Sequence, residues 1–114
     1  MSEPTKLLVI WSAADKEVAL HNVFMYTHNA KKQGWWEEVR LLIWGPSDKL
    51  LAEDEELQKR VRAMQADGID VIACKACADI YGVSEALEEL GVNVFYVGQA
   101  LTEMLKEGWV TLTY

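Results

Sequence analysis

Two cysteines three residues apart are the side chains in this sequence best suited to chemistry. Cys74 ends the apolar run of residues 69–74, and Cys77 follows it with the CxxC spacing. If a helix begins there, both thiols lie on nearly the same side of its first turn, where free N–H groups and the helix dipole favour a thiolate. Lys75 adds a positive charge beside them. A thiolate attacks the sulfur of a disulfide or persulfide, and a second thiol can then resolve the adduct.

The cysteine pair also has structural interpretations. A cysteine at the end of a buried strand is often a small apolar core residue. A zinc site needs four ligands, but the other soft side chains, His21 and His28, are separated by about 10 Å if they lie on one helix. We therefore expect no metal site within one chain, although a metal shared between subunits stays open. Each histidine is predicted to lie at the surface or at a subunit interface.

Short apolar runs alternate with amphipathic segments along the chain. The predicted strands are residues 6–11, 39–44, 69–74, 92–97 and 109–113. Their near-continuous apolarity is typical of strands covered on both faces. Glycines stand where the intervening helices should end, at Gly34, Gly68, Gly91 and Gly108. The pattern predicts a three-layer α/β/α sandwich with a five-stranded parallel sheet, in a single domain of residues 1–114. It does not predict the order of the strands.

Apolar residues at spacings of three and four positions predict the helices. The first helix is indicated by Ala19, Val23, Tyr26 and Ala30, and the second by Leu50, Leu57, Val61 and Met64. Ser47 is the predicted N-cap of the second helix. A third helical region is predicted to break at Gly82, and a short fourth contains Met104.

The predicted site lies at the edge of the sheet where the strands end, because open α/β sheets bind ligands there. The residues expected at this edge, besides the two cysteines and Lys75, are Trp11, Ser12, Trp44, Gly45, Tyr81, Gly98 and Gln99. The three aromatic side chains are expected to wall a pocket, and the amides near Gly98 to stabilise a sulfur anion. Core packing of the tryptophans and turn formation by the glycines are the other interpretations.

Composition and missing motifs exclude several classes of function. The formal net charge is −7 and the longest basic run is Lys31-Lys32, which argues against nucleic-acid binding. No run approaches the roughly 20 apolar residues of a membrane span, and no secretory leader is evident, so we expect a cytoplasmic protein. Neither GxxxxGK[ST] nor GxGxxG occurs, and no cofactor is expected.

The order of several features along the chain resembles a known family. Asp15 follows the first strand and Trp44-Gly45 follows the second, while residues 68–74 bring a cysteine to the end of the third. The other matching positions are Gly34, Gly91, Val97, Gly98, Leu101, Leu105, Gly108 and Trp109. Together they resemble the DsrE/DsrF-like family of small sulfur-relay proteins. The resemblance implies trimers or hexamers and a persulfide-carrying cysteine, which Cys74 matches. Cys77 suggests a CxxC-bearing subgroup.

These observations support one leading hypothesis and two alternatives. The leading hypothesis is a sulfur-relay or thiol-redox protein in which Cys74 accepts sulfane sulfur and Cys77 releases it by forming a disulfide. Its partners would be sulfur donor and acceptor proteins or small thiols. The alternatives are a non-enzymatic module that binds a small ligand or partner, and a structural oligomer with inert thiols. Trp35-Trp36, predicted in a turn, either pack at a subunit interface or fold back onto a helix.

Overall fold

Five parallel strands form one sheet in the order β4-β3-β2-β1-β5. The computed structural model describes residues 3–114, so Met1 and Ser2 of the predicted domain lie outside the described residues. The strands are β1 (Lys6–Trp11), β2 (Glu38–Ile43), β3 (Asp70–Cys74), β4 (Asn93–Phe95) and β5 (Val110–Thr113). The helices are α1 (Lys16–Val18), the π-helical η1 (Ala19–Phe24), α2 (Met25–Lys32), α3 (Pro46–Glu53), α4 (Glu55–Ala66), α5 (Lys75–Tyr81), α6 (Ser84–Glu89) and α7 (Gly98–Lys106).

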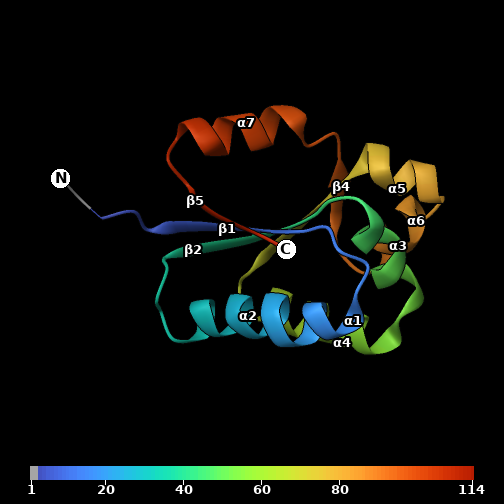
Figure 1. The fold of residues 1–114 in the computed structure, drawn as a ribbon, viewed down its shortest axis with the longest axis horizontal. Coiled ribbons are helices and arrows are strands. Elements are labelled where there is room, and N and C mark those ends of the chain that lie inside the picture. Colours follow the sequence, from blue (N-terminus) through green and yellow to red (C-terminus); the bar gives the residue numbers. More distant parts are fainter. Residues whose placement is uncertain (1–2) are drawn as a thin grey trace.

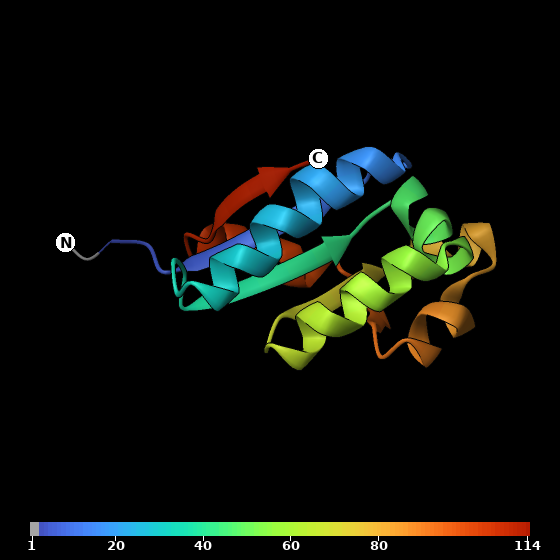
Figure 2. The ribbon, with the colours of Figure 1, turned by 90° about the horizontal axis from the view of Figure 1, so that it is seen from below.

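The direction of the crossovers determines which face of the sheet each helix covers. The chain steps from β1 to β4 in one direction across the sheet, and right-handed crossovers then place the intervening helices on one face. The connection from β4 to β5 runs back in the opposite direction, so α7 lies on the other face (Figure 1). In Figure 2, seen from below, the continuous helical stretch of α1, η1 and α2 lies beside α4 in front of the sheet. The predicted α/β fold with a five-stranded parallel sheet is confirmed.

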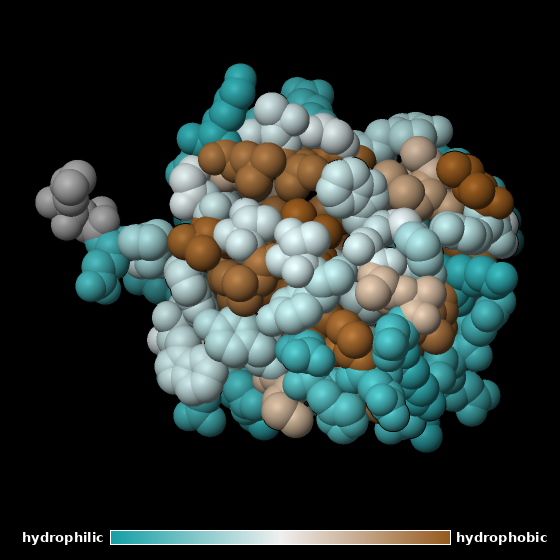
Figure 3. All heavy atoms as spheres, in the orientation of Figure 1, coloured by the Kyte–Doolittle hydropathy of each residue, from teal (hydrophilic) through white to brown (hydrophobic). Residues whose placement is uncertain are grey.

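Alternating side chains of the strands build two apolar clusters. Leu7, Val9 and Trp11 of β1 face the larger cluster, beneath which most helices lie. Leu8 and Ile10 face a smaller cluster that α7 covers. Both faces are therefore buried, which explains the continuous apolar runs of the sequence. Figure 3 shows apolar atoms also gathering where α7 meets the sheet edge formed by β5.

The second predicted helix is two helices, and its predicted N-cap is wrong. Asp54 has an extended backbone (φ −118°, ψ 112°), and its carboxylate accepts the Leu57 N–H at 3.0 Å, which ends α3 and caps α4. Gly45, with φ 105°, occupies the N-cap position of α3. Ser47 lies inside the first turn, where its buried hydroxyl donates to the Trp11 carbonyl. The local hydrogen bond between the Leu57 N–H and the Asp54 carboxylate outweighs the helical periodicity at this point.

Replacing Asp54 with alanine is expected to lower the free energy of unfolding by about 1 kcal/mol, because α4 loses its cap. The Leu57 N–H is the main cause of the lowered pKa of the Asp54 carboxyl, followed by the Lys16 ammonium at 2.9 Å. A carboxyl with a lowered folded-state pKa stabilises the fold above its unfolded pKa, and that contribution is lost as pH falls through the folded pKa. In urea unfolding, the difference in free energy of unfolding between the wild type and Asp54→Ala should therefore vanish in acid. Glu55→Ala, an exposed neighbour, is the control, and an equal loss there would contradict the capping role.

Several predicted boundaries and aromatic positions need adjustment. The predicted fourth strand shrinks to the three residues of β4, which pairs only with β3 at the sheet edge. The break at Gly82 is confirmed, with a left-handed φ of 68°. Trp36 folds back onto α2 and donates to the Tyr26 hydroxyl at 3.1 Å, whereas Trp35 is 59% exposed.

Within residues 3–114, none of the helices combines the length and apolarity needed to span a bilayer.

Candidate functional site

Cys74 and Cys77 meet where β3 ends and α5 begins. Cys74 is the last residue of β3 and only 7% exposed, while Cys77 lies in the first turn of α5 and is half-buried. Both are free thiols, and Cys77 packs against the apolar cluster that contains Cys74. The backbone N–H of Gly45, just after β2, lies near enough to the Cys77 thiol to lower its pKa slightly. This proximity depends on β2 and β3 being neighbours in the sheet.

The surroundings of Cys77 favour its protonated form. Burial is the main cause that raises the pKa of the Cys77 thiol to about 11. The interaction with Cys74 and the charge of Asp48 raise it further, and the Gly45 N–H has a smaller opposing effect. A thiol with that pKa keeps its proton at neutral pH. Since the thiolate is the nucleophile, Cys77 needs a base before it can attack another sulfur atom.

A buried carboxyl group, which sequence reasoning missed, lies on α3 beside this pair. Asp48 is 0% exposed, and neither of its carboxylate oxygens has a hydrogen-bond partner in the part of the chain that the structure describes. Burial raises the pKa of Asp48 to about 7. An aspartate in the first turn of a helix normally stabilises the helix N-terminus from the surface. The sequence signal that could have indicated Asp48 is its position shortly after β2, at the end of the sheet where Cys74 also lies.

The other predicted residues divide between this edge and the core. Trp11 is fully buried, packs edge-on against Phe24 with ring centroids 5.0 Å apart, and donates its Nε1–H to the Ala13 carbonyl. Ser12 donates its N–H and hydroxyl to the Tyr114 carbonyl at 2.7 and 3.0 Å. Trp44 follows β2 and is 41% exposed. Trp11 therefore belongs to the core, whereas Trp44 reaches the surface.

The remaining predicted residues surround the start and end of α5 and the start of α7. Lys75 Nζ lies 3.3 Å from Asp79 Oδ1, so its ammonium pairs along α5. Tyr81 borders a cleft of about 370 Å³ with Pro46, and Lys75 borders another of about 490 Å³; neither cleft is lined by a thiol. Gly98 and Gln99 begin α7, where Gln99 donates to Glu103 at 3.2 Å.

Comparison with known protein families agrees with this fold. A model of the DsrE/DsrF-like family matches residues 6–114. The chain belongs to the DsrE/DsrF-like family. Among curated proteins, no match was found.

Three solved structures resemble this DsrE/DsrF-like chain. The conserved protein of unknown function BT1422 from Bacteroides thetaiotaomicron is 35% identical, with a TM-score of 0.93 over 96% of this chain and 95% of that one. The ychN protein from E. coli is 19% identical, with a TM-score of 0.73 over 96% and 99% of the two chains. MTH1491 from Methanobacterium thermoautotrophicum, a protein of unknown function, is 20% identical, with a TM-score of 0.74 over 98% and 100%. The last two show the shared fold.

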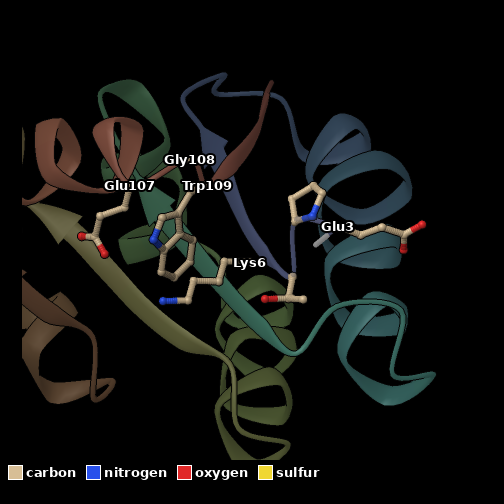
Figure 4. Close-up of a pocket in the computed structure, with 7 residues that line it drawn as sticks. Glu3, Lys6, Glu107, Gly108 and Trp109 are labelled. Carbon is tan, nitrogen blue, oxygen red and sulfur yellow. The ribbon is translucent and has the colours of Figure 1, made fainter. Parts of the chain in front are cut away.

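A separate cleft of about 350 Å³ lies at the end of the sheet where β1 and β5 begin, opposite the end that holds the cysteines (Figure 4). Lys6 Nζ lies 5.6 Å from the centroid of the Trp109 ring, and the Arg40 guanidinium carbon lies 4.8 Å from it. Arg40 also pairs with Asp70 at 3.0 Å. These cations cover the tryptophan ring at the base of the sheet. The cleft is thus remote from the cysteines.

The described residues do not gather metal ligands at either edge. Within residues 3–114, no three His, Cys, Asp or Glu side chains come close enough together to hold a metal ion. His28 Nε2 instead lies 2.6 Å from Asp67 Oδ2. At the edge of the sheet where the strands end, the groups described above are two thiols, one backbone N–H and one buried carboxyl group.

Proposed function

We propose that this protein carries sulfane sulfur as a persulfide on Cys74 and releases it through Cys77. The observation that carries the proposal is the pair of free thiols at the junction of β3 and α5, where Cys77 packs against the cluster that contains Cys74. This arrangement holds a second thiol beside the sulfur atom that would bear the persulfide. Membership of the DsrE/DsrF-like family supports the same class of chemistry.

The loading step transfers one sulfur atom from a persulfide donor. The Cys74 thiolate attacks the outer sulfur of a donor R–S–SH, a Cys74–sulfur bond forms, and the donor's S–S bond breaks. The donor leaves as a thiolate with the bonding electron pair and takes up a proton. Cys74 then carries S–SH. Phe95 and Val97, which belong to the apolar cluster around Cys74, limit the access of water to it.

The release step uses the second thiol. Cys77 attacks Cys74 Sγ, forming the Cys74–Cys77 disulfide, while the bond to the outer sulfur breaks and hydrosulfide leaves with the electron pair. The outer sulfur is reduced and the two cysteine thiols are oxidised. A thiol reductant then restores both thiols. We infer that the protein works in a reducing compartment such as the cytoplasm, as a homo-oligomer that meets persulfide donors and thiol acceptors.

Mass spectrometry after incubation with a small-molecule persulfide tests the proposal. The Cys77→Ala variant is expected to retain one added sulfur atom on Cys74, because the resolving thiol is missing. Wild-type protein is expected to pass through the same adduct to an intramolecular disulfide that has lost two hydrogen atoms. Cys74→Ala controls for adducts elsewhere. No sulfur on Cys74 in either the wild type or Cys77→Ala would exclude persulfide carriage.

The second candidate function is a binding module whose cysteines are structural. It is favoured by the 7% exposure of Cys74 within an apolar cluster. Under this alternative, both thiols would react with an alkylating reagent only after denaturation, and Cys74→Ala would keep the ligand-binding function. Under the persulfide proposal, at least one thiol reacts in the native protein.

A further inference from the structure

One buried side chain next to the cysteine pair has no part in the steps described above. The Asp48 carboxyl is completely buried, and both of its oxygens lack hydrogen-bond partners among residues 3–114. Burying such a group costs free energy unless it is compensated. Asp48 lies in the first turn of α3, and α3 packs against α5, the helix that carries Cys77. The carboxyl is therefore held on the helix that packs against the resolving thiol's helix.

We propose that Asp48 accepts the proton of Cys77 while Cys77 attacks Cys74, an inference that rests on the proposed function. The unpartnered oxygens are free to receive a proton, directly or through one water molecule. Because neither oxygen is engaged by another side chain of the described residues, no existing bond has to break first.

The protonation states explain why such a base is needed. With a pKa of about 11, Cys77 is a thiolate in about one molecule in ten thousand at neutral pH. A carboxyl with a pKa of about 7 is well matched to accept a proton under those conditions. The charge of Asp48 is also among the smaller causes of the raised pKa of Cys77, as expected for a carboxyl on the helix that packs against α5.

No other charged group on the helices around α3 shares the burial of Asp48. Every other Asp, Glu, Lys and Arg on α3, α4, α5 and α6 is exposed or half-buried. The other charged groups on the helices that flank this site are Lys49 and Glu53 on α3, Lys75 and Asp79 on α5, and Glu85, Glu88 and Glu89 on α6. Of these, Lys75 and Asp79 pair with each other at 3.3 Å. Asp48 is thus the buried base at this edge.

The proton transfer completes the balance of the release step. The Cys77 S–H bond breaks and an O–H bond forms on Asp48, while the Cys77–Cys74 sulfur bond forms. The bond from Cys74 Sγ to its outer group breaks, and that group leaves as a thiolate or hydrosulfide with the electron pair. Asp48 then returns its proton to the leaving group or to water.

An aromatic disulfide that releases a coloured thiolate isolates this step without any persulfide. Attack by Cys74 releases the first thiolate at a rate proportional to reagent concentration. Closure by Cys77 then releases the second at a concentration-independent rate. At neutral pH, Asp48→Asn is expected to slow the second release by about a hundredfold and to remove its rise with pH near 7. The first release should stay within the range of the wild type, as should both releases in Glu53→Gln, the exposed-carboxyl control on α3.

The alternative role of Asp48 predicts the opposite change. If its charge only raised the pKa of Cys77, Asp48→Asn would increase the thiolate fraction and accelerate the second release. Acceleration, an unchanged pH profile or the absence of a second release in the wild type would each overturn the inference. Failure of persulfide carriage would instead appear as a missing sulfur adduct while both coloured releases remained.

Discussion

Asp48→Asn is expected to stabilise the protein relative to the wild type by an amount that grows with pH. The Asp48 carboxyl titrates at about 7 when folded, because of its burial, but near its ordinary value of 3.8 when unfolded. Between those values the native state binds the extra proton, so wild-type stability falls as pH rises. The asparagine side chain does not titrate. The difference in free energy of unfolding between the two proteins should therefore increase by about 4 kcal/mol across this window.

Urea unfolding of both proteins at a series of pH values measures this difference. It should be constant below about pH 4, where both states of the wild type are protonated, and constant again above about pH 7. Glu53→Gln, an exposed carboxyl on the same helix, should give a difference that changes little with pH. A pH-independent offset for Asp48→Asn would show that the carboxyl is ionised and compensated in the native state.

Trp11→Ala is expected to lower the free energy of unfolding by about 3–5 kcal/mol, the usual cost of removing a large buried aromatic side chain. Trp11 is completely buried, contacts Phe24 in an edge-on arrangement, and satisfies its Nε1–H with the Ala13 carbonyl. Its removal leaves a cavity between β1 and the helix layer beneath the sheet, and the rigid strands on either side allow only partial collapse.

The chain offers a matched control for this substitution. Trp35→Ala removes the same side chain from a position that is 59% exposed, where it makes a tilted contact with Tyr26 at 5.9 Å. Its loss should cost less than about 1 kcal/mol. Chemical unfolding of both variants measures the contrast. Equal losses would mean that Trp11 does not contribute the core packing described above.

The parallel sheet could be predicted because its evidence is contained within each strand. Leu7, Leu8, Val9 and Ile10 alternate between two buried faces, and such a run has few explanations besides a strand covered on both sides. The break between α3 and α4 was missed because a single residue, Asp54, exchanges helical geometry for a cap. Helical periodicity averages over a dozen residues and does not detect such a local competition.

The candidate site was predictable only where its residues are close in sequence. The CxxC spacing brings Cys74 and Cys77 together once a helix begins directly after Cys74. The meeting of Cys77 with Gly45 and Asp48 instead requires β2 beside β3, and the pattern of apolar runs does not contain that pairing. The burial of Asp48 likewise depends on tertiary packing around α3, which contacts α4, α5 and α6.

The pairing of β5 with β1 also affects how the protein is made. Residues 110–113 bond to residues 7–10, so β1 gains its second neighbour only after roughly a hundred further residues have left the ribosome. α7, which covers Leu8, Ile10 and Leu42, emerges almost as late. During synthesis, β1, β2 and β3 can assemble with the helices beneath them while this second face stays open to water. The nascent chain therefore exposes an apolar sheet surface and an unpaired strand edge until α7 and β5 have emerged, and such surfaces are prone to aggregation.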